Sequence, residues 1–193
     1  MSGKTAVVVV YESMFGNTQR VAEAISEGLR STLTVELLRV DHAPDVLPAE
    51  VQLLVVGGPT HAFSMSRSST RDSASAQGTV VMPVETGIRE WLGQLRHEDR
   101  AAVVATFDTR VAKVRRLPGS AAKAAAKVLR RQGFTSLAGS ASFYVEDSPG
   151  PLSEGELARA RAWGRSLAAQ VRPAETDSTD DAGARLREHE LDL

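Results

Sequence analysis

The sequence predicts an α/β protein with a doubly wound, five-stranded parallel sheet and helices on both faces. Continuous apolar runs, typical of strands buried on both sides, alternate with segments in which apolar residues recur at helical spacing. Polar or glycine-containing segments also follow three of these apolar runs. Ligands bind at such strand ends in open parallel sheets, so these segments are candidate binding loops.

The first part of the chain predicts three strands and one helix. Ala6–Val10 is a continuous apolar run, as expected for a buried strand, and Gln19–Leu29 follows it with an apolar stripe at helical spacing. Leu33–Val40 is a second strand. Val51–Val56 is the third, and Gly57-Gly58-Pro59 after it is a strong turn signal.

The second part continues the alternation with two strands and three helices. Apolar residues at helical spacing predict a helix over 88–95, and the apolar run Ala101–Phe107 predicts the fourth strand. Ala121–Leu129 is alanine-rich and predicts a helix. Leu137–Val145 is the fifth strand, and a further apolar stripe over 157–171 predicts the last helix.

Length and charge divide the chain into two regions. With 193 residues it is long enough for one domain with a substantial core. Residues 1–172 carry 21 Lys and Arg against 17 Asp and Glu, whereas residues 173–193 carry 2 against 7. The second region has few apolar residues and cannot offset the entropy of ordering. We expect a domain over 1–172 and a disordered acidic tail over 173–193.

The composition excludes several classes of protein. Because there is no cysteine, disulfides and cysteine redox chemistry are ruled out, and any redox role requires a bound cofactor. Every apolar run falls short of the ~20 residues that a membrane span needs. The N-terminus resembles no signal peptide, so we expect a cytoplasmic protein without membrane contact. The 4 histidines are scattered and indicate no metal site.

The segment Tyr11–Thr18 has the build of an anion site. It joins a buried strand to a helix, and the N–H groups at a helix N-terminus lack partners within the helix. Ser13, Asn17 and Thr18 add side-chain donors, and Gly16 permits close approach of the backbone. Neither G-x-G-x-x-G nor G-K-[ST] occurs, so the loop suits a terminal monophosphate better than a dinucleotide or a nucleoside triphosphate.

Three segments together resemble the FMN loops of flavodoxin-like proteins. They are Tyr11–Thr18 (Y-E-S-M-F-G-N-T), Val55–His61 (V-V-G-G-P-T-H) and Thr106–Thr109 (T-F-D-T). The resemblance extends over about residues 4–172 and implies the strand order 2-1-3-4-5 with FMN as the cofactor. It implies FMN contacts from Ser13, Met14, Phe15, Gly16, Asn17, Thr18, Pro59, Thr60, His61, Phe63, Thr106, Phe107, Asp108 and Thr109.

The aromatic side chains divide into candidate flavin contacts and expected core residues. His61, Phe63 and Phe107 lie in the second and third loops and have flat π-surfaces that could stack on a flavin. A loop residue for His61 and a core residue for Phe107 are the alternatives. Trp91 and Trp163 sit at helical spacing among apolar partners and are expected to pack in the core.

Two further segments could add to the site. Arg110, Lys113, Arg115 and Arg116 follow the third loop and could dock an acidic electron-transfer partner or bind pyridine-nucleotide phosphates, unless they form a solvated loop. Nucleic acid is disfavoured because no aromatic residues interleave with these charges. The serine-rich stretch Ser64–Gly78 is expected as the long loop of the domain, either a lid over the flavin or an unstructured insertion.

Two functions of different classes are compatible with these features. The first is a flavodoxin-like FMN protein in electron transfer, which as an FMN-dependent oxidoreductase would reduce a small acceptor such as a quinone. The second is a flavin-free flavodoxin-like domain that binds a protein partner or another phosphorylated ligand, because one fold hosts many functions. The sequence does not predict which residues of the protein would be catalytic.

Overall fold

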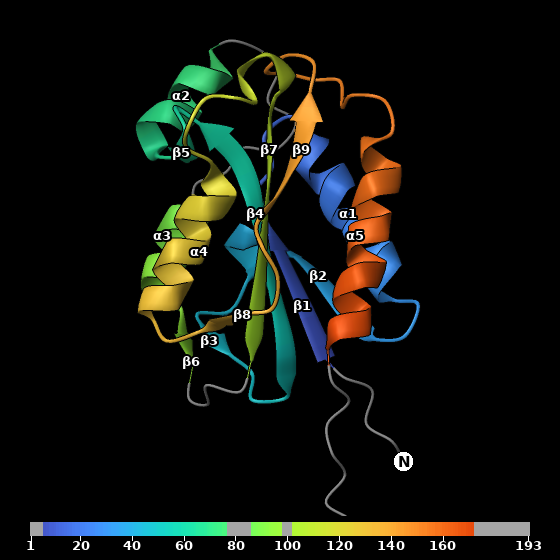
Figure 1. The fold of residues 1–193 in the computed structure, drawn as a ribbon. Helices are drawn as coiled ribbons and strands as arrows, with labels where there is room; N and C mark the ends of the chain where they lie inside the picture. The colour runs from blue at the N-terminus through green and yellow to red at the C-terminus, as the bar shows by residue number, and fades with distance from the viewer. Residues whose placement is uncertain (1–5, 77–85, 98–101, 172–193) are drawn as a thin grey trace, which may run out of the picture.

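The computed structural model describes residues 6–76, 86–97 and 102–171, and it has the predicted parallel sheet with helices on both faces (Figure 1). The sheet order is β2-β1-β4-β7-β8, with β9 also paired to β7. Counting β8 and β9 together as the fifth strand, this is the expected order 2-1-3-4-5. The fold class and strand order predicted from the sequence are therefore confirmed.

Three central strands contain the continuous apolar runs and extend beyond their carboxyl ends, and a fourth strand, of mixed polarity, forms the edge of the sheet. β1 covers Ala6–Tyr11, β2 covers Thr34–Arg39, β4 covers Val51–His61 and β7 covers Val103–Val111. All four pair in parallel. β4 and β7 run beyond their predicted ends because they pair with each other through Pro59 and Thr109, so two candidate loops begin as strand.

The fifth strand is split, whereas the sequence predicted a continuous strand over 137–145. β8 (Thr135–Ser136) pairs with the start of β7, and β9 (Ala141–Val145) pairs with its end. Between them Leu137 N donates to Val104 O at 2.8 Å, and the hydroxyls of Ser140 and Thr106 share a hydrogen bond of 2.8 Å. These bonds attach the segment between β8 and β9 to β7, although this segment does not pair with β7 as a strand.

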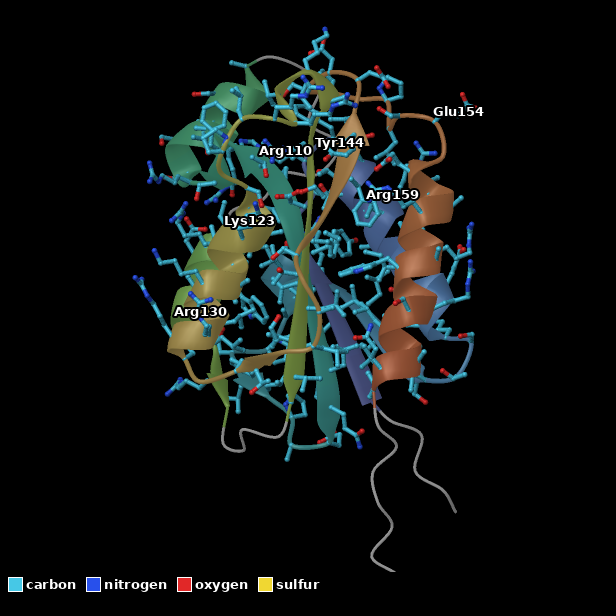
Figure 2. All side chains as sticks on the ribbon, in the orientation of Figure 1. Arg110, Lys123, Arg130, Tyr144, Glu154 and Arg159 are labelled. Atoms are coloured by element: carbon cyan, nitrogen blue, oxygen red, sulfur yellow. The ribbon has the colours of Figure 1, made fainter. Side chains whose placement is uncertain are left out.

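Two layers of helices cover the sheet. α1 (Asn17–Leu29) and α5 (Glu156–Gln170) lie on one face, and α3 (Ile88–Gln94) and α4 (Ala121–Arg131) lie on the other (Figure 1). Apolar side chains fill the space between the layers, and charged side chains extend outward (Figure 2). Where α1 meets α5, a Cβ on Gly28 would lie 2.2 Å from Arg161 O, so glycine permits this close packing.

The stretch Ser64–Gly78 is not a simple loop. It contains β5 (Ser64–Met65), which pairs antiparallel with the end of β4, and the helix α2 (Ser68–Ser75). Its last two residues lie outside the described ranges. The unstructured insertion is therefore contradicted, while the lid stays a prediction. The sequence did not reveal α2 because this helix is short and polar and is held by buried polar contacts rather than by an apolar stripe.

The remaining described elements are short. β3 (Val46–Leu47) and β6 (Arg96–His97) form a two-stranded parallel sheet, and the 3-10 turns η1 (Val40–His42) and η2 (Ala112–Val114) follow β2 and β7. The predicted acidic tail, 173–193, lies outside the described residues. Within the described part of the chain, no helix combines the length and the apolar character that crossing a membrane requires.

Candidate functional site

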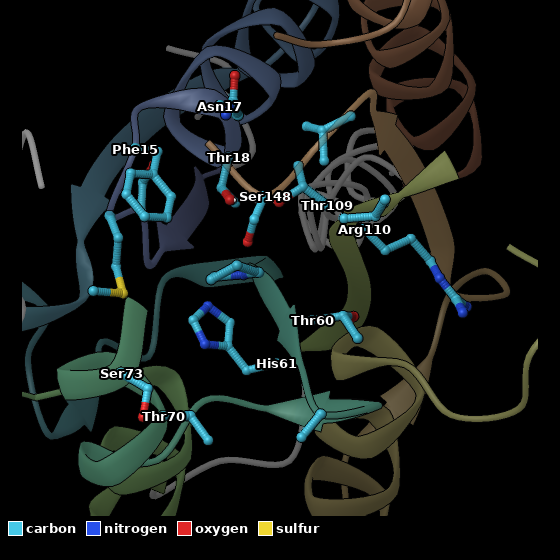
Figure 3. Close-up of a pocket in the computed structure, with 16 residues that line it drawn as sticks. Phe15, Asn17, Thr18, Thr60, His61, Thr70, Ser73, Thr109, Arg110 and Ser148 are labelled. Carbon is cyan, nitrogen blue, oxygen red and sulfur yellow. Dashed lines mark hydrogen bonds between the residues drawn. The ribbon is translucent and has the colours of Figure 1, made fainter. Parts of the chain in front are cut away.

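A cavity of about 330 Å³ lies at the carboxyl ends of β1, β4 and β7, where the three predicted loops converge. In Figure 3, Thr18, Thr109 and Ser148 lie at one end of this cavity, and Thr70 and Ser73 lie at the other, with His61 between them. The lining residues are Ser13, Met14, Phe15, Asn17, Thr18, Pro59, Thr60, His61, Ala62, Thr70, Ser73, Thr109, Arg110, Val111, Val145 and Ser148.

The first loop presents hydroxyl groups at the start of α1. Gly16 is the N-cap of α1, with φ at 83°, a conformation that favours glycine, and no side chain caps this helix. The hydroxyl of Thr18 shares a hydrogen bond of 2.7 Å with that of Thr109. Ser13 is buried, and its Oγ has no hydrogen-bond partner within the described structure. A buried hydroxyl without a partner at an uncapped helix N-terminus is the arrangement expected of an anion site.

The end of β4 supplies the middle of the cavity. Thr60 donates a hydrogen bond of 2.9 Å to Asp108 Oδ2 and accepts one of 2.9 Å from Ala121 N, so its side chain joins β4, β7 and α4. His61 lies beside it. Burial lowers the pKa of His61, and the positive charge of Arg71 lowers it further, although a hydrogen bond with the Thr70 backbone opposes the shift. His61 is therefore a neutral imidazole near neutral pH.

The structure places Phe107 outside the cavity. Its ring is fully buried against Phe143 and Trp163, with ring centroids 6.3 and 6.4 Å away. Gly57 makes room for it, because a Cβ on Gly57 would lie 2.1 Å from the Phe107 ring. Of the two alternatives that the sequence left open for Phe107, the structure has the core residue.

Four other predicted contacts do not line the cavity. Phe63 is 50% exposed at the tip of the β4–β5 hairpin. Asp108 is fully buried and accepts a hydrogen bond of 3.1 Å from Ala122 N at the start of α4. Thr106 bonds to Ser140 instead, and Gly16 shapes the first loop without lining the space. The remaining nine predicted residues are brought together around the cavity.

A model of the flavodoxin family matches residues 9–134, which is more than half of the chain. The chain belongs to the flavodoxin family. It is 30% identical over 91 residues to NAD(P)H dehydrogenase (quinone) of Geobacter metallireducens and 33% identical over 93 residues to that of Syntrophobacter fumaroxidans. Each match covers 47% of this chain and 44% of the relative, so the matched part spans less than half of these longer proteins.

Solved flavodoxin structures share the fold at low sequence identity. A flavodoxin from Streptococcus pneumoniae and flavodoxin 2 from Bacillus cereus each have a TM-score of 0.61, at 16% and 17% identity. Both matches cover 86% of this chain and 99% of the other. A WrbA-like flavodoxin from Agrobacterium tumefaciens has a TM-score of 0.51 at 19% identity, covering 87% and 98% of the two chains.

A buried ionic network supports the cavity of this flavodoxin-family protein, and sequence reasoning missed it. Glu12 accepts hydrogen bonds from Ser66 Oγ and from Ile88 N, the first amide of α3. Arg71 of α2 donates to Ser66 Oγ at 3.0 Å and to Glu90 Oε2 at 3.2 Å. Burial raises the pKa of Glu12, and these hydrogen bonds and Arg71 oppose the shift. The sequence feature that could have indicated this network is Glu12, a charged residue directly after a buried strand.

The cavity also includes residues that were not predicted as cofactor contacts. Thr70 and Ser73 come from α2, which the sequence pattern did not reveal. Ser148 follows β9, and the end of a fifth parallel strand beside β7 was the signal that could have indicated it. The other members missed are Ala62, Val111 and Val145.

The sequence suggested that Arg110 is an exposed cation at the rim of the site, but the structure has it buried. It is 7% exposed, and its Nη2 donates to the carbonyl oxygens of Val114 and Leu117 at 2.9 and 3.2 Å. Figure 3 shows its guanidinium turned away from the cavity. Lys113, Arg115 and Arg116 are exposed, as a surface docking site requires. Arg110 therefore braces the turn that carries the other three cations.

Proposed function

We propose that this protein binds FMN in the cavity and transfers electrons to a small acceptor such as a quinone. The observation that carries this proposal is the Ser13 hydroxyl, which is buried, lines the cavity and has no partner in the described structure. A terminal phosphate at the start of α1 would accept its hydrogen bond and would also satisfy the free amides of the helix. FMN supplies that phosphate, whereas riboflavin does not.

The lining residues fit the two ends of such a cofactor. Ser13, Asn17 and Thr18 would hold the phosphate, and Pro59 to His61 would lie beside the ring system together with Phe15. When bound, FMN supplies the redox chemistry, and the protein contributes binding, orientation and electrostatics. The family membership, and relatives named as quinone-type NAD(P)H dehydrogenases, support this assignment.

His61 is the residue we propose to orient the ring or the acceptor. Its lowered pKa keeps the imidazole neutral near pH 7, so one ring nitrogen carries a proton and the other accepts. The hydrogen bond to the Thr70 backbone uses the single N–H of the neutral imidazole, so the other ring nitrogen is left to accept a hydrogen bond, which suits an N–H or O–H group of the ring or the acceptor. Reduction of a quinone to a hydroquinone takes up two electrons and two protons. Thr70 and Ser73 line the same end of the cavity, where their hydroxyls could hydrogen-bond to the quinone oxygens.

A spectroscopic titration of FMN and riboflavin tests the assignment. Replacing Ser13 and Thr18 together by alanine should weaken FMN binding by about 2–4 kcal/mol, because two hydrogen bonds to a charged group are lost. Riboflavin binding should change little. Ser26→Ala is the matched control, since its buried hydroxyl donates to Ala22 O in the same helix, away from the cavity.

Three results would contradict the proposal. If the double substitution weakened FMN and riboflavin equally, the phosphate would not bind at the start of α1. Weakening by Ser26→Ala of the same size would attribute the effect to α1 as a whole. Absence of any FMN binding to the unaltered chain would favour the flavin-free domain as the function.

A further inference from the structure

We propose that the outer face of α4, together with the turn before it, docks an acidic redox protein that delivers electrons to the cavity. The inference rests on the proposed function. In each encounter the centre of the partner is oxidised by one electron and the cofactor site gains that electron. Two encounters and two protons from solvent then balance the reduction of one quinone to a hydroquinone.

The charge distribution is one-sided along this part of the chain. Residues 109–145 contain eight Lys and Arg and no Asp or Glu. Seven of the eight are exposed, and none of these seven forms an ion pair with any residue that the structure describes. We call them the cationic face: Lys113, Arg115, Arg116, Lys123, Lys127, Arg130 and Arg131.

The sequence of α4 directs its charges to one side. Ala121, Ala122, Ala125 and Leu129 are buried toward the sheet. Lys123, Lys127 and the pair Arg130–Arg131 recur at intervals of three to four residues, so they share the opposite side of the helix. Figure 2 shows Lys123 and Arg130 on this outer side. The result is a continuous stripe of positive charge along α4.

Two structural links connect the cationic face to the cavity. Arg110 lines the cavity, and its guanidinium binds the carbonyl oxygens of Val114 and Leu117 in the turn that carries three of the cations. At the start of α4, Ala121 N donates to the hydroxyl of Thr60, which also lines the cavity. A partner on this face would therefore lie next to the site that it reduces.

The cationic face also has a small exposed apolar patch at its cavity end. Phe63 and Leu117 are 50% and 47% exposed. They belong to adjoining segments, because a Cβ on Gly119 would lie 2.4 Å from Phe63 O. Transient protein interfaces typically combine a few exposed apolar groups with surrounding charges, and complementary charge speeds the encounter of the two proteins.

The same observations disfavour other ligands for this face. Single-stranded nucleic acid would need aromatic side chains interleaved with the charges, and the described part of the face has Phe63 at one end only. Insertion into a membrane surface would need an apolar stripe along α4, but its outer side is charged. The opposite helices differ, because α1 and α5 carry both signs of charge and share the Glu27–Arg161 ion pair.

The experiment measures binding of a plant-type ferredoxin, used as a model acidic iron–sulfur protein, to the full chain. Calorimetry at about 20 mM and about 300 mM NaCl should show roughly tenfold weaker binding at high salt, because screening shortens the reach of exposed charges. Lys123→Glu with Lys127→Glu should weaken low-salt binding by roughly tenfold or more. Arg30→Glu with Arg165→Glu is the control, an equal change of net charge at exposed positions of the opposite face, and it should change the affinity less than about twofold.

A second readout ties docking to the cavity. In the FMN-loaded chain, the rate of reduction by reduced ferredoxin should fall with the α4 variant, while reduction by dithionite should not change. The calorimetric result does not depend on FMN, so a chain that binds ferredoxin as expected but binds no FMN would overturn the proposed function and leave the docking surface intact.

Three outcomes would overturn the docking proposal. Equal weakening by the α4 variant and the control would mean that net charge alone acts. Binding of a short DNA duplex or of phosphatidylserine vesicles without binding of ferredoxin would assign the face to another macromolecule. Tighter ferredoxin binding, by roughly tenfold, after replacing Asp177, Asp180 and Asp181 by asparagine would identify the acidic segment of the same chain as the occupant.

Discussion

The two faces of the sheet are packed by different chemistry. Between the sheet and the α1–α5 layer, Phe107, Phe143 and Trp163 form an aromatic cluster, and Gly28 and Gly164 bring the two helices into backbone contact. On the other face, charged groups such as Glu12 are buried among the helix starts. Trp91 and Phe134 are also buried on this second face, so the difference between the faces is the buried charge and not the presence of aromatic rings.

The N-termini of the helices also differ between the two faces of the sheet. Glu12, at the end of β1, accepts from the first amide of α3, and Asp108 in β7 accepts from Ala122 N at the start of α4. Each of these two helices therefore has a carboxylate of the protein at its positive end. The start of α1 has no such group and opens to the cavity beside Ser13. This difference indicates which helix is available to an external anion.

The largest effect is expected from the aromatic cluster. Phe107→Ala should lower the free energy of unfolding by about 3–5 kcal/mol, because it leaves a cavity beneath Gly57 in a fully buried site. Urea unfolding of the flavin-free protein measures this, and FMN affinity should change little. Phe63→Ala is the control and should stay within about 0.5 kcal/mol. A loss of FMN affinity without a loss of stability would restore Phe107 as a ring contact.

A smaller loss is expected where α1 meets α5. Gly28→Ala should destabilise by about 1–3 kcal/mol, because the new Cβ would meet Arg161 O and the backbone must shift. Gly93→Ala is a matched change in α3, where nothing lies within 4 Å, and it should stabilise by up to about 1 kcal/mol. If thermal unfolding ranks the two variants in the opposite order, the close contact between α1 and α5 is not as described.

The polar face should show itself in pH dependence. The folded pKa of His61 is lowered below 6.5, so in the window below that value the unfolded chain binds a proton that the folded chain does not. Its contribution to stability is therefore lost as the pH falls through this window. Glu12, with a raised folded pKa, contributes in the opposite direction as the pH falls toward 4.5.

The difference between two unfolding profiles isolates the histidine. The free energy of unfolding of the unaltered protein, minus that of His61→Gln, should decline as the pH is lowered from about 7.5 to about 5.5. Glu12 contributes to both proteins and cancels. A difference that is flat or rises on acidification would show that His61 is not a buried neutral imidazole.

The smallest effect is expected from removing residues 173–193. The sequence of this segment has few apolar residues, so we expect neither face to lose core contacts. The free energy of unfolding should change by less than about 0.5 kcal/mol, measured by calorimetry at moderate salt. A large fall in the melting temperature would show that the acidic segment docks on one of the faces.

Sequence periodicity predicted most of the architecture and part of the site. The runs at Ala6–Val10 and Val51–Val56 are continuously apolar, as expected of strands buried on both faces, and their ends located the cavity. Periodicity did not reveal α2, because that helix is polar and is held through Arg71. It also did not divide β8 from β9, since the interruption depends on contacts with β7.

By itself, the sequence determined the alternation of strands and helices and the three loops at the strand ends, because these depend on neighbours along the chain. The strand order was implied by the resemblance to flavodoxin-like proteins, and the hydroxyl-rich anion site stays a prediction. Only the tertiary structure decided which side chains face the cavity. Phe107 and Thr109 are two residues apart in one strand, yet Gly57 draws the first into the core and Thr18 holds the second at the cavity. Such choices are made by residues that are distant in sequence and adjacent in space, so no local pattern encodes them.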